Sequence, residues 1–356
     1  MRVVTVGVVG VLLLAGCADG SSFDELEAAE QRVAELEEEL SQAQEPLATT
    51  ATSAPATTTA PATTTASETH PLEDVEGCRS YLNDEPGDEF EYWECDENAE
   101  LRGLDLTGAT LWNMNLEGAD LSGANLTHAN LLYTDLDGAN LTDANLSFAY
   151  LRATYLPDVD LTGANLFYAY LYSAYLPDAD LAGADLRYAD LIATDLINAT
   201  LEGADLTEAK LGYADLTGAD LREAELTEAW LGDANLEGAN LTDADLFAAG
   251  LKDADLGDAN LTNANLTKAN LSYAYLREAD LELADLTEAN LELANLTNAK
   301  LGYADLTNAN LYKADLTGAD LYKADLTGVD LNGLIGWDTV KGKDTIIGLG
   351  SLFGDD

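Results

Sequence analysis

The sequence predicts an all-β solenoid that turns a corner every five residues. Every fifth residue from Leu101 to Leu331 is leucine, and the residue two positions before each leucine is nearly always alanine. The position directly before each leucine is usually Asp or Asn. The exceptions to alanine are Leu104, Met114, Thr134, Thr154, Val159, Thr194 and Val329. An internal repeat of this strictness determines the architecture before any other feature is considered.

A period of five residues fits neither regular element. Leucines five apart would step about 140° around an α-helix, and they would alternate between the two faces of a flat strand. If the chain instead turns by about 90° after each unit, every leucine points toward one axis and four units close a coil. The tetrapeptide at 155–158, Tyr-Leu-Pro-Asp, recurs four units later at 175–178, which supports a coil of that length.

With the unit Ala-(Asp/Asn)-Leu-x-x, residues 101–331 resemble the pentapeptide repeat family. The resemblance implies a right-handed quadrilateral β-helix in which the leucine and the small residue two positions before it point inward. Stacking at a β spacing of ~4.8 Å would make roughly twelve coils into a rod about 55 Å long. Alanine suits the second inward position because the interior of such a prism is narrow.

Residues 1–17 are typical of a bacterial lipoprotein signal peptide. A short basic start precedes an apolar run at 3–14, which is too short for a membrane-spanning helix of ~20 residues. The following Leu-Ala-Gly-Cys, which ends at Cys17, resembles a lipobox and implies cleavage before Cys17 and lipidation of its side chain. The alternative is a plain signal peptide with a chance cysteine. The sequence thus predicts an extracytoplasmic protein that is lipid-anchored to a bacterial membrane.

Residues 18–71 are predicted to separate this anchor from the repeats. Within 18–45, Leu26, Val33 and Leu40 recur at every seventh position among many Glu and Gln residues, which favours a short acidic helix or coiled coil. Weak self-association through residues 22–44 is one interpretation, and a single solvated helix is the other. Residues 46–71 are mainly Thr, Ala and Pro with almost no charge, which predicts a disordered linker.

The segments on either side of the repeats are predicted to cap them. Residues 72–100 contain Cys78 and Cys95 among aromatic residues, and in an oxidising compartment such a pair favours a disulfide over a metal site. Residues 332–356 lack the period but are rich in apolar side chains, which favours a C-terminal cap, with a docking surface as the alternative. The apolar residues are Leu334, Ile335, Trp337, Ile346, Ile347, Leu349, Leu352 and Phe353.

The outward positions of the repeats are strongly acidic. The chain has 66 Asp and Glu against 16 Lys and Arg, for a net charge of −50. Such a charge excludes direct binding to nucleic acid or to an anionic membrane surface. We expect the Asp and Asn before each leucine to hydrogen-bond local backbone at the corners, so part of this charge is structural. Bridging of the in-register Asp285, Asp305 and Asp325 by divalent cations is a further hypothesis.

Aromatic residues gather around residues 148–188, and four tyrosines there share the position directly before a leucine. They are Tyr150, Tyr155, Tyr170 and Tyr175. Tyr150 and Tyr170 lie one coil apart, as do Tyr155 and Tyr175. The four should therefore form an amphipathic patch across one corner, suited to contact with an envelope protein or a glycan. The alternative interpretation is packing between neighbouring coils that stiffens this part of the rod.

The sequence predicts no enzyme, no metal site and no cofactor. His70 lies in the linker and His128 stands alone on a coil, so no nucleophile, base or metal ligand set converges. We therefore expect a non-catalytic, lipid-anchored surface scaffold that displays a stiff acidic rod. The alternative follows from the family resemblance, because some cytoplasmic members mimic DNA and bind gyrase. A DNA-mimic inhibitor would require this protein to be cytoplasmic.

Overall fold

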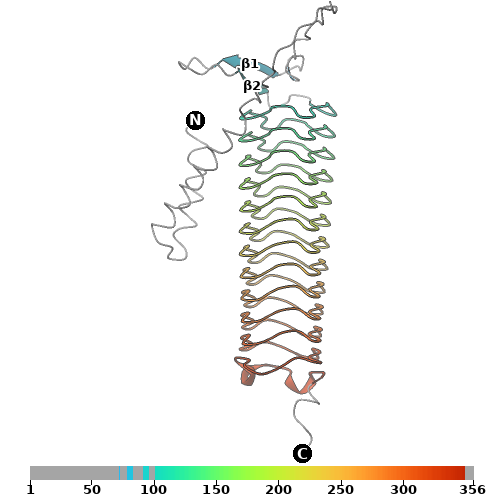
Figure 1. The fold of residues 1–356 in the computed structure, drawn as a ribbon, viewed down its shortest axis with the longest axis vertical. Helices are drawn as coiled ribbons and strands as arrows, with labels where there is room; N and C mark the ends of the chain where they lie inside the picture. Colours follow the sequence, from blue (N-terminus) through green and yellow to red (C-terminus); the bar gives the residue numbers. More distant parts are fainter. Residues whose placement is uncertain (1–71, 73–77, 83–90, 96–100, 349–356) are drawn as a thin grey trace, which may run out of the picture. The chain divides into compact units, whose positions relative to one another are not determined.

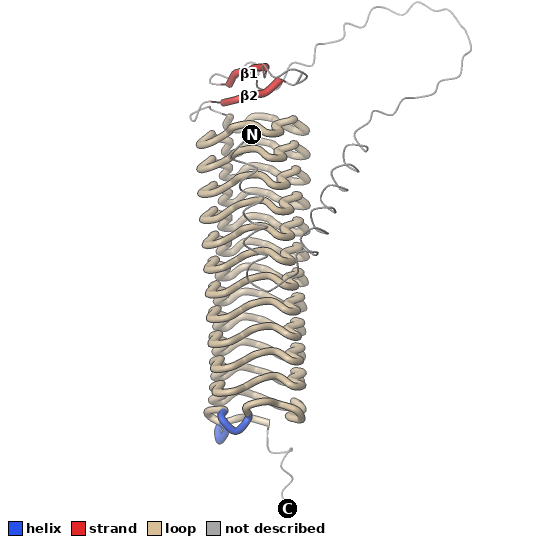
Figure 2. Tube along the Cα trace, turned by 90° about the vertical axis from the view of Figure 1, so that its left-hand side faces the viewer, coloured by secondary structure: helices blue, strands red, loops and turns tan. Residues whose placement is uncertain are grey.

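The computed structural model describes residues 72, 78–82, 91–95 and 101–348. Two short strands, β1 (Cys78–Leu82) and β2 (Glu91–Cys95), precede a solenoid that runs through residues 101–348. The last coil contains two 3-10 helices, η1 (Trp337–Thr339) and η2 (Lys343–Thr345). Figures 1 and 2 show the solenoid's coils stacked on one another. The predicted signal peptide (1–17), acidic helix (18–45) and linker (46–71) lie outside the described residues.

Parallel backbone pairing joins successive coils on all four sides as far as the bridge between Asn290 and Asn310. The first bridges pair Asp105 with Asn125, Thr110 with Asn130, Asn115 with Asp135 and Asp120 with Asn140, so these partners are four repeat units apart. On one side, the N–H of Leu106 donates to the carbonyl of Asn125 and the N–H of Asn125 donates to the carbonyl of Leu104, both at 2.8 Å. The predicted right-handed quadrilateral β-helix is confirmed.

Each corner is a tight turn with a left-handed third residue. The N–H of Ala109 donates to the carbonyl of Leu106 at 3.0 Å, and Gly108 between them has a φ of 65°. These are features of a type II turn. Bulky residues also take this position, including Tyr168 with a φ of 53° and Leu283 with a φ of 64°. In the repeats it is never Val, Ile or Thr, because a β-branched side chain is strongly strained at positive φ.

Leucine and alanine fill the interior, and threonine replaces alanine at three places. The buried hydroxyl groups of Thr134, Thr154 and Thr194 each donate to a leucine carbonyl of the preceding coil. The donor–acceptor distances are 2.7 Å to Leu111, 2.9 Å to Leu131 and 3.1 Å to Leu171. Threonine is tolerated in the narrow core because its polar atom is paired, which avoids the free-energy penalty of an unsatisfied buried hydroxyl.

The five-residue period ends at Leu331, but the β-helix continues through one more set of bridges. These pair Asp315 with Ile335, Asp320 with Lys341 and Asp325 with Ile347, so the separation in sequence grows by one residue at each successive side. Each extra residue is accommodated by a 3-10 turn, first η1 and then η2. The predicted cap segment 332–356 therefore contains an additional coil with six-residue sides, which the sequence analysis did not identify.

Only part of the apolar set predicted to form the cap packs against the hydrophobic core. Leu334, Trp337 and Ile346 are half-buried against the hydrophobic core. Ile335 and Ile347 are exposed. The remaining three, Leu349, Leu352 and Phe353, lie outside the described residues.

Threonine hydroxyl groups take over the role of backbone carbonyls where this coil meets the preceding one. In the coil before, the N–H of Asn298 donates to the carbonyl of Thr317 at 2.8 Å. The corresponding N–H of Gly318 instead donates to Oγ1 of Thr339 at 2.8 Å, and that hydroxyl donates to the carbonyl of Gly336 at 2.7 Å. Thr345 repeats the arrangement at the next corner. The six-residue sides thus keep the corner N–H groups of Gly318 and Lys323 paired.

The two strands before the solenoid form an antiparallel pair with Cys78 directly opposite Cys95. Cys78 is disulfide-bonded. Leu72 is fully buried and belongs to the same hydrophobic cluster as Leu101. The assignment of residues 72–100 as a cap stays a prediction.

Gly342→Ala should destabilise the C-terminal end far more than Gly203→Ala. Both glycines have positive φ, 72° and 64° respectively, so each substitution costs about 1–2 kcal/mol of backbone strain. A Cβ at Gly342 would also lie 2.7 Å from the backbone of Tyr322, whereas a Cβ at Gly203 would meet nothing within 4 Å. The clash should add roughly 1–3 kcal/mol. Denaturant unfolding with amide hydrogen exchange of the last coil measures both, and equal losses would contradict the packing argument.

Candidate functional site

The four candidate tyrosines form two stacked pairs on adjacent faces of the rod, here called the tyrosine pairs. Tyr150 stacks on Tyr170 with ring centroids 5.1 Å apart, and Tyr155 stacks on Tyr175 at 5.3 Å. The ring planes differ by 8° in both pairs. The pairs occupy successive repeat units, so one corner lies between them. Three of the rings are exposed, Tyr150 to 50 %, while Tyr175 is half-buried.

A longer run of stacked rings, here called the aromatic column, lies at a neighbouring corner. It consists of His128, Phe148, Tyr168 and Tyr188, with successive ring centroids 5.0, 5.6 and 4.8 Å apart. Phe167 packs edge-on against Tyr168 at 4.7 Å. The column ends where the hydroxyl of Tyr188 donates to Oε1 of Glu208 at 3.0 Å. This column was not predicted from the sequence, although its members recur once per coil at the third position of a turn.

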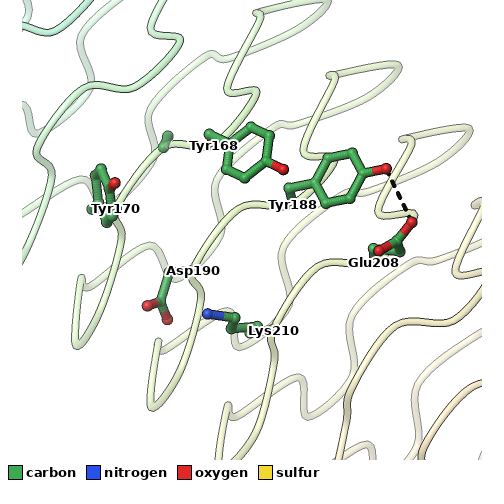
Figure 3. Close-up of a pocket in the computed structure, with 7 residues that line it drawn as sticks. Tyr168, Tyr170, Tyr188, Asp190, Glu208 and Lys210 are labelled. Atoms are coloured by element: carbon green, nitrogen blue, oxygen red, sulfur yellow. Dashed lines mark hydrogen bonds between the residues drawn. The ribbon is translucent and has the colours of Figure 1, made fainter.

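A pocket of ≈ 340 Å³ lies beside Tyr170, and we call it the tyrosine groove. Its lining residues are Tyr168, Ala169, Tyr170, Tyr188, Asp190, Glu208 and Lys210 (Figure 3). Parallel bridges place Asp190 next to Tyr170 and Lys210 next to Asp190 on one face of the rod. Tyr168 and Tyr188 come from the aromatic column at the adjoining corner. Three successive coils therefore supply one site with aromatic, acidic and basic side chains.

The Asp and Asn residues before the leucines bind local backbone, as the sequence predicts. Oδ1 of Asp105 accepts from the N–H of Thr107 at 3.2 Å, and Oδ1 of Asn295 accepts from the N–H of Thr297 at 3.0 Å. The side chain and backbone N–H of Ser122 bind Asp120 in the same way and lower the pKa of its carboxyl group. Much of the rod's negative charge is thus part of its corner structure.

Two carboxylates near the tyrosine pairs, Asp137 and Asp195, are electrostatically unfavourable, because burial and neighbouring acidic groups raise the pKa of each. Burial raises the pKa of Asp195, and the nearby charges of Asp215 and Asp178 raise it further. Asp195 bridges directly to Tyr175. Burial raises the pKa of the Tyr175 hydroxyl, and Asp195 and Asp178 add to that shift. This side of the tyrosine pairs therefore carries a cluster of carboxylates that disfavours further negative charge.

The acidic columns form no preorganised metal site within the described ranges. There, no group of three or more His, Cys, Asp or Glu side chains is placed to hold a metal ion. Asp285, Asp305 and Asp325 do bridge in register. Each of them accepts a hydrogen bond from the N–H of the threonine two residues later. The bridging-cation hypothesis therefore depends on carboxylates that already serve the corners.

Several predicted features fall outside this site. His128 stacks in the aromatic column, while His70 and the predicted lipidation site Cys17 lie outside the described residues. In the part of the chain that the structure describes, no helix combines the length and apolar character needed to cross a membrane. The absence of catalytic residues and of a cofactor stays a prediction.

Asp195→Asn should stabilise the rod at pH 7, raising the melting temperature by on the order of 1–2 °C. Asparagine keeps the oxygen that accepts from the N–H of Ile197 and removes the disfavoured charge. The folded pKa of Asp195 is raised, so acidification protonates the folded wild type first. The gain should therefore disappear as the pH falls through that pKa.

Asp120→Asn is the matched control for this prediction, because hydrogen bonds from Ser122 lower the pKa of Asp120 and favour its charged form. That variant should lower the melting temperature at pH 7. Thermal unfolding of the three proteins across a pH series tests both changes. A gain in both variants would mean that general charge repulsion, and not the surroundings of Asp195, limits stability.

Eight copies of the family model described as "Pentapeptide repeats" match the chain. The matched residues are 98–143, 144–183, 164–203, 184–223, 201–238, 224–263, 264–302 and 294–333. No curated protein matches the chain.

Among solved structures, the chain is similar to HetL from the cyanobacterium Nostoc sp. strain PCC 7120, a pentapeptide repeat protein involved in the regulation of heterocyst differentiation. The two are 40% identical over 54% of this chain and 86% of HetL, with a TM-score of 0.53. The plasmid-mediated fluoroquinolone resistance protein QnrB1 is 22% identical over 53% of this chain and 91% of its own, with a TM-score of 0.33. A pentapeptide repeat protein of the Arabidopsis thaliana thylakoid lumen is 29% identical over 39% of this chain and 88% of its own, with a TM-score of 0.18. Because the family matches extend from residue 98 to residue 333, the chain belongs to the pentapeptide repeat family.

Proposed function

We propose that this protein is a non-catalytic binding rod, lipid-anchored to the outside of a bacterial membrane. The observation that carries the proposal is the tyrosine groove with its neighbouring tyrosine pairs, an exposed aromatic surface on a chain of net charge −50. Exposed aromatic rings on an otherwise charged surface are typical of contact sites. The groove lies on rigid, hydrogen-bonded coils, which suits recognition of a ligand without rearrangement.

The segments before the rod would attach it to the membrane and hold it away from the membrane surface. Lipidated Cys17 would hold the protein at the membrane, since several acyl chains on one residue make a stable anchor. Residues 18–71 would act as a stalk, and the linker at 46–71 could reach about 80 Å when extended. The binding partner would then be an envelope protein or a glycan that the stalk allows the rod to reach.

Lipidation is tested by expressing the full chain in a bacterium with an intact lipoprotein pathway, with and without Cys17→Ser. We expect a membrane-bound protein whose mass includes acyl chains, and loss of both properties in the variant because the thioether attachment point is gone. Cell fractionation and intact mass measurement report the result. A soluble, uncleaved protein in the cytoplasm would overturn the lipid-anchor proposal.

The contact role of the tyrosine pairs is tested by changing Tyr150, Tyr155, Tyr170 and Tyr175 together to Ser. Retention of envelope components in a pull-down should be lost, while the free energy of unfolding falls only by the value of the two stacking contacts, about 0.5–1.5 kcal/mol each. The control variant changes four other exposed tyrosines to Ser, namely Tyr213, Tyr273, Tyr275 and Tyr303. If the first variant still retained the envelope components, the contact role would be wrong, and packing between neighbouring coils would be the remaining interpretation of the tyrosine pairs.

A second candidate function is inhibition of a DNA-binding enzyme such as gyrase by DNA mimicry. The observation that favours it is the net charge of −50 on a chain whose carboxylates form straight columns, such as Asp285, Asp305 and Asp325. It requires the protein to be in the cytoplasm, so the Cys17 experiment decides between the two proposals. If the protein is cytoplasmic, inhibition of DNA supercoiling by gyrase is the next measurement.

A further inference from the structure

We propose that the tyrosine groove binds one sugar ring of a neutral polysaccharide, with the ring stacked against Tyr170. This inference rests on the proposed function as a surface binding rod. It narrows the ligand from an envelope protein or glycan to a neutral glycan, and it assigns the contacts to residues of three successive coils. Three features of the groove support it: an uncovered ring face, a pocket of suitable size, and polar groups of both hydrogen-bonding types.

The column that contains Tyr170 is interrupted where a third ring would be expected. Tyr150 covers one face of the Tyr170 ring, with centroids 5.1 Å apart and planes within 8°. On the other side the next residue of the column is Asp190, whose side chain is too short to cover a phenol ring. Figure 3 shows the Tyr170 ring edge-on, with Asp190 and Lys210 following on the same face. A flat ligand can therefore occupy the place that a third tyrosine would take.

The remaining walls make this place a pocket. Tyr168 and Tyr188 stack at 4.8 Å along the adjoining corner and close one side. The hydroxyl of Tyr188 is held by Glu208 at 3.0 Å, which fixes the orientation of that wall. The volume of ≈ 340 Å³ is at the lower end of the range of roughly 300–1,000 Å³ for small-ligand sites. One sugar ring with its substituents suits a site of this size better than a peptide segment does.

The polar groups of the groove suit a ligand that both donates and accepts hydrogen bonds. Asp190 and Glu208 offer acceptor oxygens, and Lys210 offers only donors. An ammonium or guanidinium group has no acceptor for Lys210. A sulfate or carboxylate has no donor for Asp190 and Glu208, and the charge of −50 on the chain repels it. A neutral polyhydroxyl ring satisfies all three side chains, because each hydroxyl is donor and acceptor.

The first experiment titrates the full chain with neutral hexasaccharides by isothermal calorimetry. The probes are cellohexaose, maltohexaose and mannohexaose, with hexagalacturonate and the chitosan hexamer as the anionic and cationic counterparts. We expect at least one neutral hexamer to bind with an affinity that stays constant between low and high salt, whereas attraction of the chitosan hexamer by the −50 charge of the chain should fall with salt. Failure of all three neutral hexamers to bind would overturn the proposal. It would also be overturned if the chitosan hexamer still bound most tightly at high salt.

The second experiment locates the site with variants. Tyr170→Ala and Asp190→Ala should each weaken binding of the neutral hexamer by about tenfold or more, because each removes a contact worth about 1.4 kcal/mol. Tyr170→Phe should keep affinity within about threefold, since the ring face remains. Tyr275→Ala is the matched control, because Tyr275 takes the same position before a leucine on another face and is 54 % exposed. Equal weakening by Tyr170→Ala and Tyr275→Ala would overturn the assignment to the groove.

The two proposals fail in different ways. If the protein is membrane-bound and retains an envelope protein but binds no neutral hexamer, the glycan inference is wrong and the proposed binding rod stands. If a neutral hexamer binds in the groove but the chain remains soluble and uncleaved, the lipid anchor is wrong and the glycan site stands. Melting temperatures of all variants within a few degrees of the wild type ensure that loss of binding reflects the groove and not the fold.

Discussion

The backbone ladder between successive coils is the constraint on which every other feature of this protein depends. Each residue before a leucine pairs with the equivalent residue of the next coil, so side chains at that interval lie directly above one another. The surface is therefore organised in columns, and a residue's neighbours follow from its number alone. Tyr150 and Tyr170 stack for this reason, and so do the four rings of the aromatic column.

The same backbone ladder also brings carboxylates of successive coils close together on the surface. Identical carboxylates in one column would stand about 4.8 Å apart, where they repel. The sequence relieves the repulsion locally with amides and guanidinium groups. Nδ2 of Asn265 donates to Oδ1 of Asp245 at 2.8 Å, and Arg222 contacts both Glu202 and Asp220. At Asp195, burial raises the pKa of the carboxyl group, and the neighbouring charges of Asp215 and Asp178 raise it further.

The repeat was predictable because each of its positions has one dominant requirement. Leucine fills the axis, alanine leaves room for it, and Asp or Asn binds the N–H two residues later, so the pattern defines the coil. The C-terminal coil was not predictable from that pattern. Its two Gly-x-Asp-Thr segments, at 336–339 and 342–345, depend on a hydroxyl that replaces a carbonyl, and a sequence does not show such an exchange.

The tyrosine groove shows a similar limit of sequence reasoning. Tyr150, Tyr155, Tyr170 and Tyr175 were identifiable from their spacing, and their stacking followed from it. The groove, however, combines Tyr170 with Asp190 and Lys210 of the same column and with Tyr168 and Tyr188 of another. It exists because Asp190 is short where another ring would have filled the space. Repetition predicts what recurs, whereas this pocket arises from an interruption.

Because the ladder has a fixed interval, the number of repeat units sets both the position of a surface feature along the rod and the direction in which it faces. Gain or loss of four repeat units between the first coil and the groove would move the groove along the axis by one β spacing and leave it facing the same way. Gain or loss of a single unit would turn it by a quarter of a revolution. Insertion or deletion of whole repeat units during evolution can thus change the direction in which a surface feature faces without changing the residues that form it.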